Sequence, residues 1–161
     1  MSSLPPNYLA ALAALARASD LYLKATGRRA VIVGGAAVSF YTNGQILSGD
    51  FDIVTDIDFE RFLLSVGFKK ESGPGRFLGG YYHPDIPDLG FEFVSGALFD
   101  GRANEDKLLA VPIEGADVVF AAIEDLIADR LAQYASSRNK AGDMLTQARL
   151  LLSLATDCDR T

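Results

Sequence analysis

Cysteine and histidine are scarce in this chain, and long hydrophobic runs are missing from it. Cys158 is the single cysteine among 161 residues, which excludes an intrachain disulfide and is typical of a reducing cytoplasm. His83 is the single histidine, so a zinc site is disfavoured. No apolar run approaches the roughly 20 residues of a membrane span, and the stretch Met1–Asn7 lacks the pattern of a secretion signal. We therefore expect a cytoplasmic protein with no membrane partner.

An excess of basic residues is also missing. The chain has 15 lysines and arginines against 21 acidic residues, a net charge of −6, and its pI is about 4.7. Proteins that follow a nucleic-acid backbone usually present a basic face. We therefore expect no extended nucleic-acid-binding face. The net charge does not exclude a small basic pocket that holds one end of a nucleic acid.

What the chain does contain is enough apolar material for a core. Hydrophobic residues make up 49% of the sequence, and the mean hydropathy is +0.16. Helices are expected over residues 7–26, 35–41, 59–67, 123–136 and 140–155, and strands over 30–33, 50–54, 77–83, 90–95, 108–113 and 116–120. This order predicts an α/β (α+β) fold, with a mixed β-sheet flanked by helices and a C-terminal helical pair. We expect a core over residues 1–121, with the helices of 122–161 packed on it as one compact unit.

A buried-looking strand runs into two glycines, Gly34 and Gly35, where a helix is expected to begin. Glycines at such a turn let backbone N–H groups approach a phosphate closely. The segment therefore indicates phosphate binding.

Asp50 and Asp52 stand at strand spacing shortly after these glycines. Side chains alternate along a strand, so both carboxylates face one way while Phe51 and Ile53 pack behind them. Two neighbouring carboxylates repel each other and favour a cation between them. The alternative is a solvated face of an edge strand, which is the commoner explanation for a lone Asp-x-Asp.

Glu92 repeats the pattern, because Phe91 and Phe93 point away from it. If its strand is adjacent to that of Asp50 and Asp52, the three carboxylates converge. Such oxygen ligands suit Mg²⁺, with Mn²⁺ as a second choice. Metal ions held there would activate a hydroxyl and stabilise a leaving pyrophosphate.

Arg130 lies on the apolar stripe of the helix expected over residues 123–136, a stripe formed by Ile123, Leu126, Ile127, Leu131 and Tyr134. An inward arginine needs an anion, and Asp143 or a substrate phosphate would provide one. An internal salt bridge or a side chain that reaches back to solvent explains Arg130 equally well.

The combined pattern resembles the polymerase-β-type nucleotidyltransferase superfamily, and it is most similar to small bacterial nucleotidyltransferases of the abortive-infection toxin type and their uncharacterised relatives. The resemblance covers residues 30–152. It is carried by Val33-Gly34-Gly35, Asp50-Phe51-Asp52-Ile53, Tyr82-His83-Pro84, Phe91-Glu92-Phe93, and the segment 123–131 with Asp143. The sequence differs from that pattern at Gly35, where many members carry a serine, and at Arg130, where relatives often carry a lysine. The spacer of about fourteen residues before Asp50 is also slightly long, and the Arg-x-Lys-Asp pattern expected before the last helix appears only loosely as Arg138, Lys140 and Asp143.

The resemblance implies a metal-dependent enzyme that transfers a nucleoside monophosphate from an NTP to an acceptor hydroxyl or phosphate. In this hypothesis Asp50, Asp52 and Glu92 are catalytic and hold the metal, while Gly34, Gly35 and Arg130 bind the nucleotide. The resemblance does not identify the acceptor, for which the candidates are a tRNA end, a protein and a small molecule. The alternative hypothesis is a non-catalytic nucleotide-binding or interaction module of the same fold, within a toxin–antitoxin pair.

Overall fold

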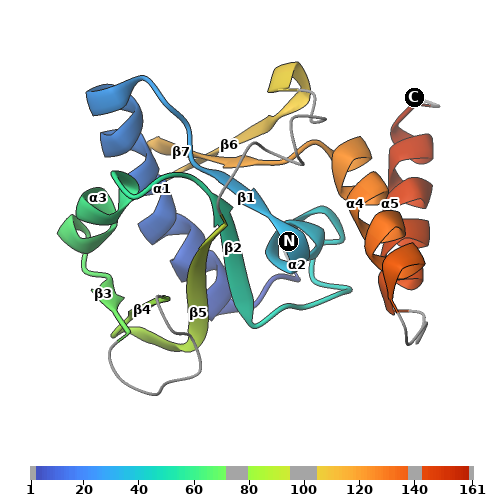
Figure 1. The fold of residues 1–161 in the computed structure, drawn as a ribbon, viewed down its shortest axis with the longest axis horizontal. Helices are drawn as coiled ribbons and strands as arrows, with labels where there is room; N and C mark the ends of the chain where they lie inside the picture. The colour runs from blue at the N-terminus through green and yellow to red at the C-terminus, as the bar shows by residue number, and fades with distance from the viewer. Residues whose placement is uncertain (1–2, 72–79, 95–104, 138–142, 160–161) are drawn as a thin grey trace.

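The computed structural model describes residues 3–71, 80–94, 105–137 and 143–159, and there it has the mixed α/β fold that the sequence predicts (Figure 1). The helices are α1 (Pro6–Thr26), α2 (Gly34–Tyr41), α3 (Phe59–Ser65), α4 (Ile123–Ser136) and α5 (Asp143–Asp159), with a 3-10 helix, η2, over Glu105–Lys107. The strands are β1 (Val31–Val33), β2 (Asp50–Val54), β3 (Lys69–Lys70), β4 (Tyr81–His83), β5 (Ile86–Val94), β6 (Leu109–Ile113) and β7 (Ala116–Phe120).

Within the described ranges the strands form one seven-stranded sheet in the order β3-β4-β5-β2-β1-β7-β6. The centre of the sheet is mixed, because β1 is antiparallel to β2 and parallel to β7, and β2 is parallel to β5. The hairpin of β6 and β7 follows the prediction and ends the sheet. Pro112, which has no N–H to donate, is placed on this outer strand, where a proline is tolerated.

One face of the sheet is covered by α1, which passes behind the strands in Figure 1. Phe51 of β2 is fully buried, and its ring lies 5.2 Å from that of Phe91 on β5 and 5.1 Å from that of Tyr8 on α1. The alternation of side chains along β2 therefore sends Phe51 and Ile53 into the core and turns Asp50 and Asp52 to the opposite face.

The segment around His83 differs from the prediction. The turn expected over Pro84–Pro87 is shorter, since β4 ends at His83 and β5 begins at Ile86. Pro87 is thus inside a strand, next to an irregularity in the β4–β5 register, which is where the pairing accommodates a residue without an N–H. Positions 77–79, 95 and 140–142, at the ends of predicted elements, lie outside the described residues.

The two C-terminal helices contact each other and α2. Contacts before α4 fix its start: the Phe40 ring of α2 stacks on Phe120 at 4.3 Å, and the Tyr41 hydroxyl donates to the carbonyl of Ala121 at 2.7 Å. These contacts place the start of α4 beside the end of α2. In the part of the chain that the structure describes, no helix combines the length and apolar character needed to cross a membrane.

Candidate active site

The turn from β1 into α2 is built on Gly34, where the helix begins one residue earlier than predicted. Its φ of +63° is in the left-handed region that favours glycine. A Cβ on Gly34 would lie 2.8 Å from Oδ2 of Asp52. The backbone conformation and the lack of a side chain therefore both matter, since the Asp52 carboxylate lies directly against this turn.

Gly35 leaves room for Ser48, a residue that the sequence analysis did not single out. A Cβ on Gly35 would lie 2.8 Å from the Ser48 hydroxyl oxygen. That hydroxyl donates to the carbonyl of Asp50 at 3.1 Å, and the Ser48 N–H donates to Ser39 Oγ at 3.1 Å. Ser39 in turn donates to the carbonyl of Gly35 at 3.0 Å. The two serines thus connect the glycine turn to the start of β2, and no pattern in the sequence indicates this connection.

The strand that carries Asp50 and Asp52 is inside the sheet, so the edge-strand alternative is wrong. In the register of β2 and β5, Asp52 pairs with Glu92, and Asp50 pairs with Gly90, which has no side chain. Asp52 and Glu92 are therefore neighbours on the face opposite α1, with Asp50 one pair further along.

The donor chemistry fits a hard divalent cation only in part. Among the described residues, no group of three histidine, cysteine or acidic side chains is assembled that could hold a metal ion. Mg²⁺ is usually bound by one or two carboxylates, with water and substrate phosphates completing its coordination. Asp52 meets that smaller requirement together with either of its acidic neighbours on this face, Asp50 or Glu92.

Electrostatics link these carboxylates to α4. Burial raises the pKa of Asp52 above its ordinary value, and the negative charges of Glu92 and Asp50 raise that pKa further. The Arg130 guanidinium opposes the rise in the Asp52 pKa. The residues on the face opposite α1 therefore disfavour the ionised form of Asp52, and a bound cation would favour it.

Arg130 is buried, as the apolar stripe predicts, with 6% of its surface exposed. Its anion, however, is not Asp143. The guanidinium donates to Oδ2 of Asp129 from Nη2 at 2.6 Å and from Nε at 3.2 Å, and Nη1 lies 3.5 Å from Gln147 Oε1 on α5. The long side chain folds back onto its sequence neighbour. Leu131, which the stripe placed inward, is 44% exposed.

No protein-family model matches the chain, and no curated protein sequence matches it. Solved structures do resemble it. An antigenic nucleotidyltransferase-like protein from Paracoccidioides brasiliensis aligns with a TM-score of 0.64 and 19% identity, over 96% of this chain and 78% of that one. ANT(2″)-Ia, solved in complex with adenylyl-2″-tobramycin, aligns with a TM-score of 0.57 and 15% identity, over 95% of this chain and 92% of that one.

Proposed function

We propose that this chain, which has the nucleotidyltransferase fold, transfers a nucleoside monophosphate from an NTP to an acceptor hydroxyl or phosphate in the presence of Mg²⁺. The observation that carries the proposal is the position of the Asp52 carboxylate. It lies beside Glu92 in the sheet register and against the Gly34 turn at the start of α2. Carboxylates for a metal ion and N–H groups for a phosphate are thereby adjacent.

Each residue in this proposal has a separate role. Asp50 and Asp52 would hold Mg²⁺, which when bound neutralises charge on the triphosphate. Gly34 and Gly35 present N–H groups at the positive end of α2, where the first N–H groups of a helix lack intrahelical acceptors. Arg130 adds positive charge from α4.

Glu92 would accept the proton of the acceptor hydroxyl. The acceptor oxygen forms a bond to the α-phosphorus, the bond from that phosphorus to the bridging oxygen breaks, and the electron pair leaves with pyrophosphate. Glu92 suits this role because it lies beside Asp52 in the register of β2 and β5, on the same side of the sheet.

The test is to incubate the full chain with Mg²⁺, each α-labelled NTP in turn and a cell extract, and to measure pyrophosphate and the labelled fraction. We expect one NTP to label an acceptor and Asp52→Asn to abolish the labelling. If Asp50→Asn and Asp52→Asn both transferred label as the wild type does, the proposal would be wrong.

A second candidate is a module that binds nucleotide without turnover, within a toxin–antitoxin pair. It is favoured by the engagement of Arg130 with Asp129, which occupies the guanidinium that would contact phosphate, and by the lack of a hydroxyl at Gly35. Binding of NTP and Mg²⁺ without pyrophosphate release would select it. For the acceptor in the enzymatic case, a tRNA end, a protein side chain and a small molecule such as an aminoglycoside remain the candidates that the labelled fraction distinguishes.

A further inference from the structure

Next to the carboxylates, on the same face of the sheet, the register aligns a row of small aliphatic side chains. This row crosses four neighbouring strands and consists of Val54, Val31, Val119 and Ala110. It runs parallel to the row of Glu92, Asp52 and Val33. The two rows are separated by two residues along each strand, roughly 7 Å.

The aliphatic row is the floor of an open depression. A cavity of about 510 Å³ is lined by Val31 and Val54, and one of about 450 Å³ is lined by Val119 and Ala110. Both cavities are also lined by Arg29, Glu105 and Leu108. We call the two together the aliphatic trough, since they share these walls and one continuous floor.

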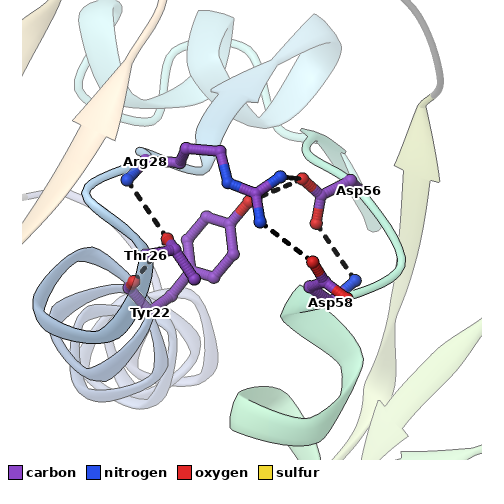
Figure 2. A network of polar contacts seen from close by, with 5 residues as sticks. All are labelled: Tyr22, Thr26, Arg28, Asp56 and Asp58. Carbon is purple, nitrogen blue, oxygen red and sulfur yellow. Dashed lines mark hydrogen bonds and ion pairs between the residues drawn. The ribbon is translucent and has the colours of Figure 1, made fainter.

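One wall of the trough is fixed by ion pairs, which Figure 2 shows. Arg28 contacts Asp56 through Nη1 and Asp58 through Nη2, the latter at 2.9 Å. The Tyr22 hydroxyl donates to Asp56 Oδ2 at 3.0 Å, and the Arg28 N–H donates to Thr26 Oγ1 at 3.1 Å. The charge of Arg28 is therefore already compensated within the fold.

Arg29 differs from its neighbour. Among the described residues, ion pairs are made by Arg28 and not by Arg29, although Arg29 lines both cavities. A guanidinium at the edge of an aliphatic floor is suited to a carboxylate or a phosphate, which it binds with two parallel hydrogen bonds. Glu105, on the same walls, offers an acceptor for a hydroxyl or amine.

We infer that the aliphatic trough is the acceptor subsite, an inference that rests on the proposed nucleotidyl transfer. Its ligand is a small molecule with an apolar body, a hydroxyl group and one anionic group. The anionic group binds Arg29, the body lies on the valine floor, and the hydroxyl reaches the adjoining row of Asp52 and Glu92. Reaction at that hydroxyl forms the ester to the nucleotide phosphorus described above, and pyrophosphate leaves.

Methyl NMR of the full chain tests the subsite without requiring turnover. The probes are 6-hydroxyhexanoate, 6-hydroxyhexyl phosphate and, as a neutral control, 1,6-hexanediol. We expect the methyl signals of Val31, Val54, Val119 and Ala110 to shift with one anionic probe and to respond to the diol at least tenfold more weakly. The two anionic probes distinguish a carboxylate ligand from a phosphate ligand.

Arg29→Gln should weaken binding of the responding anionic probe by roughly tenfold or more, the scale of a lost charge-assisted hydrogen bond. Arg17→Gln is the matched control, because Arg17 is an exposed arginine of α1 that pairs with Glu114 at 3.9 Å and does not line the trough. Equal weakening in both variants, or a wild type whose trough methyls respond to neither anionic probe, overturns the inference.

The same samples separate this inference from the proposed function. NTP with Mg²⁺ should shift the amide signals of Gly34 and Gly35. If those amides respond and the trough methyls respond to no probe, the trough is not the subsite while nucleotide binding stands. If the glycine amides do not respond to nucleotide, the proposed function fails whatever the trough binds.

Discussion

The chain has two pairs of aspartates at identical spacing, Asp50/Asp52 and Asp56/Asp58. The two pairs differ in whether positive charge within the fold compensates their carboxylates. The later pair is compensated: both carboxylates contact Arg28, and Asp56 Oδ1 accepts the N–H of Asp58 at 3.0 Å. In the earlier pair, Asp52 lies beside Glu92, and burial and like charges raise its pKa. The same residue type at the same spacing therefore has two different electrostatic environments.

The difference supports the proposal that Asp56 and Asp58 belong to the fold and that Asp50 and Asp52 belong to a ligand site. A compensated pair stabilises the connection between β2 and α3. A half-buried carboxylate among like charges costs stability, and such perturbed groups concentrate at sites where a ligand supplies the missing charge. The predictions below test this distinction between the two pairs.

Replacing one aspartate from each pair should give the largest contrast. Asp52→Asn should lower Mg²⁺-dependent pyrophosphate release by roughly 100-fold or more, the scale of removing one electrostatic stabiliser of a transition state. Asp58→Asn should change the rate of pyrophosphate release less than about threefold, because Asp58 contacts Arg28 and lies outside the row of Glu92, Asp52 and Val33. A continuous pyrophosphate assay measures both, and equal losses in the two variants would refute the assignment.

The close approach of Gly34 to Asp52 can be tested through stability. Gly34→Ala and Gly27→Ala both place a side chain at positive φ, +63° and +73°, which costs about 1–2 kcal/mol. At Gly27 a Cβ meets nothing within 4 Å, whereas at Gly34 it meets the Asp52 carboxylate. We expect Gly34→Ala to cost about 1 kcal/mol more in urea unfolding.

In an Asp52→Gly background this excess should vanish, because the colliding carboxylate is gone. An excess that persisted there would mean that the glycine turn is strained for a reason unrelated to Asp52.

Much of the fold could be predicted because its elements have strong local patterns. The strand Asp50–Val54 and the helix Ile123–Ser136 have the bounds expected from alternation and from the apolar stripe. By contrast, β3 has only two residues, Lys69 and Lys70, both exposed, and its pairing depends on β4 rather than on any pattern of its own. No sequence pattern used above shows how α3 begins, where Asp56 Oδ1 accepts the Asp58 N–H and the Asp58 side chain makes no capping hydrogen bond.

For the candidate site, the sequence indicated which residues belong to it but not how they are arranged relative to one another. Alternation along a strand gave the face of Asp52, but whether β2 and β5 are neighbours depends on sheet order, which a strand pattern does not contain. Burial of Arg130 followed from the helical period, while its partner did not: adjacent helix positions point in different directions, yet the long guanidinium folds back onto Asp129. Ser48 lies in the loop between α2 and β2, and loop residues have no regular periodicity from which the position of a side chain could be predicted.

Removing a compensated carboxylate should have a moderate effect on stability alone. Asp56→Ala deletes the acceptor for the Asp58 N–H at the start of α3 and the acceptor for the Tyr22 hydroxyl. We expect a loss of about 1 kcal/mol, as for other helix-start residues, in chemical unfolding. NTP and Mg²⁺ binding, measured by calorimetry, should be unchanged, and a parallel loss of binding would show that the two aspartate pairs are not independent.

The smallest effect is the pH dependence of stability that Asp52 produces. Because the folded state raises the pKa of Asp52, the protonated form is favoured on folding, and this stabilisation is lost as pH rises through the raised pKa. Asn cannot ionise, so Asp52→Asn should melt above the wild type at pH 7. The advantage should shrink as pH falls through the raised pKa of Asp52 and should vanish below about 4, where the unfolded carboxyl is protonated too.

Asp58→Asn should instead melt below the wild type at pH 7, because it removes a carboxylate that Arg28 contacts. Added Mg²⁺ should narrow the gap between Asp52→Asn and the wild type, because a cation beside Asp52 stabilises only the chain that carries the charge. Melting curves at several pH values, with and without Mg²⁺, measure both effects. If Asp52→Asn melted below the wild type at pH 7 without Mg²⁺, the Asp52 charge would already be compensated within the fold, and the contrast between the two aspartate pairs would disappear.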